Sequence, residues 1–120
     1  MADGNGVRKD PVVGVKVVGD AYVVKLGGEL DLYNAGDVRE ALAQAAADGP
    51  QRVVVDLSEV EFIDSTALGV LIEARTKLNN RRAFLLAAPA LETRRALEVS
   101  GLDRHFTVHE SVSEALLAKV

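Results

Sequence analysis

The sequence is most informative at Phe62-Ile63-Asp64-Ser65-Thr66-Ala67-Leu68-Gly69-Val70-Leu71. This stretch follows the apolar run Val53-Val54-Val55-Asp56-Leu57, which predicts a strand, and it opens a run with helical character. Two neighbouring hydroxyls, those of Ser65 and Thr66, therefore stand where a strand leads into a helix. The N–H groups at a helix start are unpaired and carry the positive end of the helix dipole, so a phosphate is electrostatically tolerated there.

A purely structural explanation fits the same residues. Asp, Ser and Thr are favoured N-cap residues, so Asp64, Ser65 and Thr66 could serve only to start the helix. Local spacing alone favours this capping role, because such caps are common. The choice between a cap and a modification site therefore depends on the rest of the sequence.

Composition and charge limit the class of protein. The chain has 120 residues, the usual size of one domain, and its 27% charged and 48% hydrophobic residues are typical of a globular protein. The net charge of -4 argues against direct nucleic-acid binding. Because the chain has no cysteine, a disulfide framework, a thiolate nucleophile and a thiolate metal site are excluded.

Hydropathy along the chain indicates neither a membrane span nor a secretion signal. No apolar run approaches the roughly 20 residues that cross a bilayer. Residues 1–10 lack the apolar segment of a signal peptide. We therefore expect a cytoplasmic protein without membrane contact, with a flexible tail over residues 1–10 and a single domain over residues 11–120.

Hydrophobic periodicity predicts that strands and helices alternate. The predicted strands cover residues 12–18, 21–26, 51–57, 82–87 and 104–108, and the first two form a hairpin around Gly19-Asp20. The predicted helices cover residues 34–48, 65–78 and 90–99, and a capping-box pattern at residues 111–114 opens a last one. The order β-β-α-β-α-β-α-β-α predicts an α/β fold with a mixed, mostly parallel sheet of about five strands and about four helices.

Local interpretations complete this picture. The strand over residues 51–57 has a continuous apolar centre, which places it in the middle of the sheet with both faces covered. The pair Gly27-Gly28 is interpreted as a turn at a strand end. Val60 and Phe62, between strand and helix, are assigned to the core.

Several chemistries lack the residues they need. His105 and His109 are the only histidines and have no carboxylate pattern of metal type, so we expect no metal site. The glycine-flanked serine of hydrolases and the glycine-rich phosphate loops are absent as well. A phosphate-carrying aspartate would be Asp56 or Asp31 at a strand end. The acidic pair that holds magnesium in such proteins is missing after the first strand.

Three motifs carry a resemblance to a known family. The run from Val55 to Leu71, Val-Asp-Leu-Ser-Glu-Val-Glu-Phe-Ile-Asp-Ser-Thr-Ala-Leu-Gly-Val-Leu, resembles the signature of STAS domains, and more narrowly that of bacterial anti-sigma factor antagonists. Gly28-Glu29-Leu30-Asp31 matches their second motif, and residues 100–109 resemble their third. The resemblance extends over residues 12–117 and implies a STAS-type fold.

The resemblance also implies a mechanism. Such an antagonist, when unphosphorylated, binds an anti-sigma factor that is itself a GHKL-type serine/threonine kinase, and so releases the sigma factor for transcription. The kinase phosphorylates the second hydroxyl of the Asp-Ser-Ser/Thr core, the complex dissociates, and a PP2C-type phosphatase resets the switch. By position the acceptor is Thr66, with Ser65 as second choice. The family more often has serine at the position of Thr66 and glycine at that of Ala67.

The expected function is therefore that of a phosphorylation-controlled binding module, not an enzyme, without a cofactor and present as a monomer or weak dimer. A phosphate adds about −1.5 to −2 charges, which is disruptive in a contact surface that must be desolvated. The residues expected to bind the partner are Asp31, Asp64, Ser65, Thr66, Ala67, Leu68 and Gly69.

Two alternatives remain open at this point. In the first, the same fold is a constitutive scaffold subunit of a stress-signalling or transport assembly. In the second, the protein is an enzyme that carries a phosphate on Asp56 or Asp31.

Overall fold

Five strands and four helices follow one another in residues 10–78 and 82–119, the part of the chain that this computed structural model describes. The strands are β1 (Val12–Val18), β2 (Ala21–Leu30), β3 (Arg52–Ile63), β4 (Ala83–Ala87) and β5 (Thr107–His109). The helices are α1 (Ala35–Ala47), α2 (Ser65–Lys77), α3 (Leu91–Ser100) and α4 (Val112–Leu117), and a short 3₁₀ helix at Leu102–Arg104 follows α3. The predicted order and the α/β class are confirmed. Of the predicted tail over residues 1–10, only Asp10 falls within the described residues.

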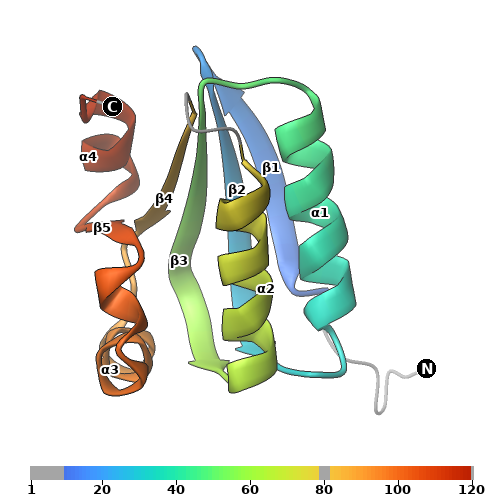
Figure 1. Ribbon diagram of the computed structural model, residues 1–120, viewed down its shortest axis with the longest axis vertical. Coiled ribbons are helices and arrows are strands. Elements are labelled where there is room, and N and C mark those ends of the chain that lie inside the picture. Colours follow the sequence, from blue (N-terminus) through green and yellow to red (C-terminus); the bar gives the residue numbers. More distant parts are fainter. Residues whose placement is uncertain (1–9, 79–81, 120) are drawn as a thin grey trace.

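The strands form one mixed sheet with the order β1-β2-β3-β4-β5. β1 and β2 pair antiparallel as the predicted hairpin, and the other neighbours pair parallel. Each parallel pair needs a crossover, which α1, α2 and α3 supply in turn. Because such crossovers are right-handed and the strand order never reverses, these three helices cover the same face of the sheet. Figure 1 shows α1 and α2 side by side in front of it.

The main core lies between the sheet and these three helices. β3 contributes Val53, Val55 and Leu57, each at most 1% exposed. They pack in one cluster with Val38 and Leu42 of α1, Leu68 and Leu71 of α2, and Leu97 of α3. A strand that is buried on both faces needs apolar residues throughout, which is why β3 has the continuous apolar centre from which its central place was predicted.

The opposite face of the sheet, called the open face below, carries only α4 among the described helices. Ala115 of α4 packs there on Val23, Val54 and Leu85. The buried Arg52 fixes this helix to the start of β3. Its Nη1 donates hydrogen bonds to the carbonyl oxygens of Ala115, Leu116 and Ala118 at 2.8, 3.1 and 2.9 Å. A guanidinium there satisfies carbonyls that a helix end leaves unpaired.

β2 and β3 both run further than predicted. The Gly27-Gly28 pair does not form a turn at a strand end, because β2 continues through it to Leu30 and pairs with β3 as far as Ile63. A Cβ atom at Gly27 would lie 2.8 Å from Cγ2 of Val13, so the absence of a side chain makes room for Val13 of the neighbouring strand β1. Gly28 has a φ of 74°, which glycine adopts without strain.

The longer β3 corrects two further expectations. Asp56 lies within the strand at 8% exposure, not at its end, and its Oδ1 accepts a hydrogen bond from the N–H of Ser58 at 3.0 Å. Phe62 is 53% exposed and not in the core, whereas Val60 is 1% exposed as predicted. The reason is a bulge, in which β3 advances two residues, from Val60 to Phe62, while β2 advances one.

The last strand also differs from its prediction. It was expected over residues 104–108, but Leu102–Arg104 form the 3₁₀ helix and β5 is only Thr107–His109. The capping-box pattern at the start of α4 is confirmed in part, because Ser111 Oγ accepts from the N–H of Glu114 at 3.0 Å. No helix in the described residues combines the length and the apolar character that a membrane crossing requires.

Candidate functional site

Asp64 caps the helix that carries the two hydroxyls. It lies between β3 and α2 in an extended conformation, and its Oδ1 accepts a hydrogen bond from the N–H of Ala67 at 2.9 Å. This is the geometry of an N-cap residue, which pairs one of the orphan donors in the first turn. The structural role that the sequence offered to three residues therefore belongs to Asp64 alone.

The second oxygen of the same carboxylate holds the neighbouring loop. Oδ2 of Asp64 accepts a hydrogen bond from the N–H of Leu32 at 3.1 Å, and the N–H of Asp64 donates to the carbonyl oxygen of Leu30 at 3.0 Å. Because β2 and β3 are parallel neighbours, their carboxyl ends meet at one edge of the sheet. Asp64 thus joins the two segments that leave this edge.

Asn34 shapes the loop between β2 and α1. Its side chain is buried at 8% exposure, its Oδ1 accepts from the N–H of Asp31 at 2.9 Å, and its Nδ2 donates to the carbonyl oxygen of Glu29 at 2.8 Å. Oδ1 of Asp31 accepts from the N–H of Tyr33 at 3.0 Å. These local hydrogen bonds fix a tight turn at the end of β2, and that turn presents the two residues in its middle to solvent.

Ser65 and Thr66 are both exposed in the first turn of α2. The three residues that follow them in α2, which were also expected to bind the partner, differ in their exposure. Ala67 and Leu68 are 1% and 6% exposed and pack into the main core, so they hold the helix from beneath. Gly69 is exposed one turn further on. The two hydroxyls are therefore accessible on a helix that is firmly seated.

Large apolar side chains lie exposed beside these hydroxyls. Leu32 is 59% exposed, Tyr33 81% and Phe62 53%. We call these three residues the apolar rim. Leu32 is linked to the site through Asp64 Oδ2, and Phe62 precedes Asp64 by two residues. Exposed aromatic and aliphatic groups gathered at one end of a small domain are typical of a protein-binding surface.

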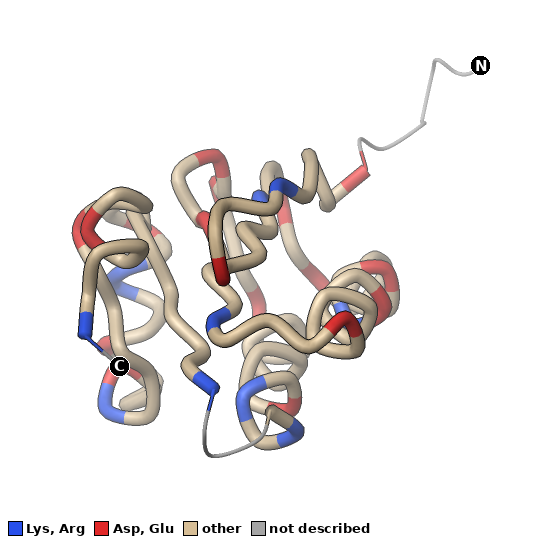
Figure 2. Tube along the Cα trace, turned by 90° about the horizontal axis from the view of Figure 1, so that it is seen from above, with Lys and Arg blue, Asp and Glu red and all other residues tan. Residues whose placement is uncertain are grey.

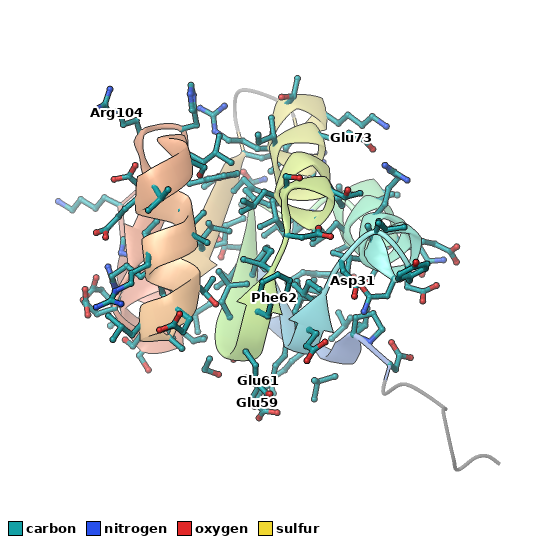
Figure 3. The ribbon with its side chains drawn as sticks, turned by 90° about the horizontal axis from the view of Figure 1, so that it is seen from below. Asp31, Glu59, Glu61, Phe62, Glu73 and Arg104 are labelled. Atoms are coloured by element: carbon teal, nitrogen blue, oxygen red, sulfur yellow. The ribbon has the colours of Figure 1, made fainter. Side chains whose placement is uncertain are left out.

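Acidic side chains border the rim. Glu59 and Glu61 are exposed on β3. Figure 3, which views the molecule from below, shows them beneath Phe62 in the picture, with Asp31 to its right. Glu59 Oε2 pairs with Lys25 Nζ at 2.7 Å, and this hydrogen bond raises the pKa of the lysine. The surroundings of the rim therefore carry more negative than positive charge.

The far end of α2 has the opposite sign. Arg75 and Lys77 occupy its last turn, where cations complement the helix dipole, and Figure 2 shows basic residues at that end of α2. Glu73 links α2 to α1, because its Oε2 lies 2.9 Å from Arg39 Nε and 3.3 Å from Lys77 Nζ. The hydrogen bond from Lys77, followed by that from Arg39, holds the pKa of Glu73 below its usual value.

The described residues offer no metal chemistry at this site. Among residues 10–78 and 82–119, no group of three or more His, Cys, Asp or Glu side chains converges as a metal site would require. His109 Nδ1 instead lies 3.1 Å from Glu114 Oε1 near α4, and this contact holds the pKa of Glu114 below its usual value.

The structure brings together much of what the sequence proposed for the site. Asp31, Asp64, Ser65 and Thr66 lie at the same edge of the sheet. The apolar rim and Asn34 were not found from the sequence. Phe62 was assigned to the core because it alternates with polar residues in the same way as the buried Val60. The exposure of Leu32 and Tyr33 depends on the tight turn that the Asn34 side chain stabilises. No sequence motif predicts this turn.

Comparisons with known proteins show which family the chain resembles. The model of the STAS domain family matches residues 13–115. The chain is similar to the anti-sigma-F factor antagonist RsfB of Mycobacterium tuberculosis, with 36% identity over 94 residues that cover 78% of this chain and 77% of that one. It is also 33% identical to an anti-sigma-B factor antagonist of Staphylococcus aureus, over 74% of this chain and 83% of that one.

A solved structure shares the fold over most of the chain. The crystal structure of an anti-sigma factor antagonist from Mycobacterium paratuberculosis superimposes with a TM-score of 0.80 at 33% sequence identity. The match covers 85% of this chain and 87% of the other.

Proposed function

This chain belongs to the STAS domain family, within its anti-sigma factor antagonists, and from that membership we propose that it binds an anti-sigma factor and thereby frees a sigma factor for transcription. The family expected from residues 28–31, 55–71 and 100–109 is confirmed, and anti-sigma factor antagonists are regulatory proteins, not enzymes. The proposed partner is an anti-sigma factor with a GHKL-type kinase domain, and we place the interaction in the cytoplasm. The alternative of an enzyme that carries phosphate on Asp56 or Asp31 is not supported, because anti-sigma factor antagonists are not enzymes. Asp56 is moreover buried within β3.

The main support for this proposal is that helix capping and the exposed hydroxyls belong to different residues at the start of α2. Asp64 makes the cap, which leaves the exposed hydroxyls of Ser65 and Thr66 without a structural task there. The apolar rim lies next to them and supplies the kind of surface that a protein partner buries. Accessible hydroxyls inside a binding surface are what a phosphorylation-controlled contact requires.

We propose Thr66 as the phosphate acceptor and Ser65 as the second choice. Thr66 is the second residue of α2, where the unpaired N–H groups and the positive end of the dipole tolerate a phosphate. The fold therefore survives modification. The bound complex does not, because a doubly charged group beside Asp64 would have to be desolvated against the partner.

The other predicted partner-binding residues then have distinct parts. Asp64 and Asp31 shape the surface through their backbone contacts, and Gly69 extends it along α2. Ala67 and Leu68 act from the core by fixing the position of the helix. The residues that would make the partner contact itself are Ser65, Thr66 and the apolar rim.

Measuring sigma release by variants at the two hydroxyls tests this proposal. Each GHKL-type anti-sigma factor of the source organism would be purified in complex with its sigma factor and titrated with the antagonist. Wild type and Thr66→Val should release the sigma factor, whereas Thr66→Glu should not. Thr66→Gln, which has the size of the glutamate side chain without its charge, is the matched control and should release the sigma factor as wild type does.

The outcome separates the proposal from its alternative. Release by wild type that is lost in Thr66→Glu supports a reversible switch, which a PP2C-type phosphatase would reset. Equal binding by wild type and Thr66→Glu would contradict a switch at Thr66 and favour a constitutive scaffold subunit of a stress-signalling or transport assembly.

A further inference from the structure

β1 forms an edge of the sheet, and no other strand of the described residues pairs with its outer side. The strand order ends at β1, whose pairing with β2 is the one pairing it makes among the described residues. Such an edge presents unpaired backbone N–H and C=O groups and acts as a template for another strand. Natural edge strands are usually blunted by several charges, by proline, by a β-bulge or by a cover. β1 has a bulge only near its start, between Val12 and Gly14. Within Val12–Val18 the one charged residue is Lys16.

The hairpin geometry determines which backbone groups point outward. Val18 pairs with Ala21 across the two-residue loop Gly19-Asp20, and Gly19 has a φ of 58°, as a tight hairpin turn requires. The pair that closes such a loop is hydrogen-bonded, and antiparallel pairs alternate from there. Lys16 and Gly14 therefore bond to β2, while Val15 and Val17 direct their N–H and C=O groups away from it.

These outward-facing positions are also apolar and exposed. Val15 and Val17 are 51% and 59% exposed, and Val13 is 53% exposed. At the start of the strand, Asp10 Oδ1 accepts the N–H of Val12 at 2.8 Å and so occupies that donor. The open part of the edge therefore lies between Val13 and Val18.

We propose that this edge pairs with the β1 edge of a second copy of the chain, antiparallel and with Val15 opposite Val15. The sequence Val-Val-Gly-Val-Lys-Val-Val is nearly palindromic about Val15. An isologous contact requires this kind of self-complementarity, because the same patch must meet itself. In this register Val17 lies opposite Val13, and each Lys16 lies opposite Gly14, where no side chain competes for space.

Antiparallel β1–β1 pairings with the two-fold axis at another residue are less favourable. A two-fold axis at Lys16 places two lysines directly opposite each other, which is destabilising. An axis at Val17 brings Val15 against Gly19 in the hairpin loop and leaves Val13 unpaired. Val15 is the axis that pairs the exposed valines without opposing charges.

The proposed contact leaves the functional site free. β1 runs antiparallel to β2, so Val18 lies beside Ala21, at the opposite end of β2 from Leu30. Ser65 and Thr66 stand at the Leu30 end of the sheet. The assembled pair therefore presents two sites, each of which can bind a partner and be phosphorylated.

Single cysteine variants of the full chain test both the contact and its register, because the natural chain has no cysteine. Under mild oxidation Val15→Cys should cross-link into a dimer, since opposed residues in a hydrogen-bonded pair have Cα atoms about 5.5 Å apart, within disulfide range. Val17→Cys should cross-link poorly, because in this register the two copies of that residue are four positions, or about 14 Å, apart along the strands. Val99→Cys, at an 89% exposed position on α3, measures random collision.

A second experiment measures self-association without a cross-link. In sedimentation equilibrium, Val15→Lys should raise the dimer dissociation constant roughly tenfold or more, because it opposes two ammonium groups. Val99→Lys, the matched control, should leave it unchanged. Cross-linking of Val15→Cys no greater than that of Val99→Cys would overturn the contact. Efficient cross-linking of Val17→Cys with itself would overturn the register.

Discussion

The carboxylate of Asp64 binds the N–H of Leu32 at 3.1 Å through one oxygen while its other oxygen caps α2. A single side chain therefore positions both the helix that carries the hydroxyls and the loop that carries part of the apolar rim. The two elements are far apart in sequence, and the parallel pairing of β2 with β3 brings them together. The site depends on this carboxylate for its shape.

Replacing Asp64 separates these two tasks. Asp64→Ala should lower the free energy of unfolding by about 1–2 kcal/mol, because the first turn of α2 loses its cap. Asp64→Asn keeps only one acceptor, so it can cap the helix but not also accept the N–H of Leu32. We expect it to cost less than alanine in urea unfolding. Amide exchange at Leu32 should nevertheless accelerate in both variants, and unchanged exchange there would contradict the link.

Asn34 should matter more than its sequence context suggests. Asn34→Ala removes the two hydrogen bonds that the Asn34 side chain makes with the N–H of Asp31 and the carbonyl oxygen of Glu29, which should cost about 1–3 kcal/mol. Asn34→Asp keeps an acceptor for Asp31 but sets a carboxylate oxygen against the carbonyl of Glu29. Thermal unfolding of both variants should therefore show lower midpoints than wild type. Gln44→Ala, at an exposed position in α1, is the control and should have no such effect.

Phe62 and Val60 form a matched pair, one exposed and one buried. Phe62→Ala should change the free energy of unfolding by no more than about 0.5 kcal/mol, as is usual for surface positions. It should weaken binding to the anti-sigma factor roughly tenfold or more, since exposed aromatic residues often anchor interfaces. Val60→Ala should instead cost about 2 kcal/mol in stability. Calorimetric titration of both variants against the partner would expose an error if Phe62→Ala bound normally.

The link between α1 and α2 should depend on pH. The pKa of Glu73 is lowered in the fold by Lys77 and Arg39, so its ion pairs stabilise the protein fully above the unfolded pKa near 4.5. That stabilisation is lost as the pH falls through the lower, folded pKa. Glu73→Gln should therefore be slightly less stable than wild type at pH 7, and the difference should vanish in strong acid.

The pH profile of Glu73→Gln needs a matched helical carboxylate as its control. Glu98→Gln, on the exposed surface of α3, serves this purpose. Thermal midpoints would be recorded for wild type and both variants between pH 7 and pH 2. A stability difference for Glu73→Gln that persists unchanged at the acid end would mean that the ion pairs are not its cause.

Much of the fold was predictable from sequence because its signals are local. The continuous valines of β3 predict a buried central strand, and the change in hydrophobic periodicity after Asn34 and Asp64 predicts helices. The hairpin at Gly19-Asp20 has the glycine that its turn requires. The bulges are not local, because they depend on how β2 and β3 shift against each other. The ends of both strands and the exposure of Phe62 follow from these shifts.

The site was predictable only in part for the same reason. Asp64, Ser65 and Thr66 are adjacent in the chain, and their motif is recognisable. The contact from Asp64 to Leu32 and the turn held by Asn34 are tertiary features, which appear only once the two parallel strands end side by side. Which of three capping residues makes the cap is decided by backbone geometry as well, and Asp64 does so from its extended conformation.

The position of the phosphate tests the proposed switch more directly than any other measurement. The chain would be incubated with Mg-ATP and each GHKL-type anti-sigma kinase of its organism, and intact mass and fragment mapping would locate the modification. We expect one phosphate on Thr66, present in Ser65→Ala, absent in Thr66→Ala, and accompanied by dissociation of the complex. A stable complex that forms with one of these kinases and yields no phosphate on Thr66 would contradict this expectation.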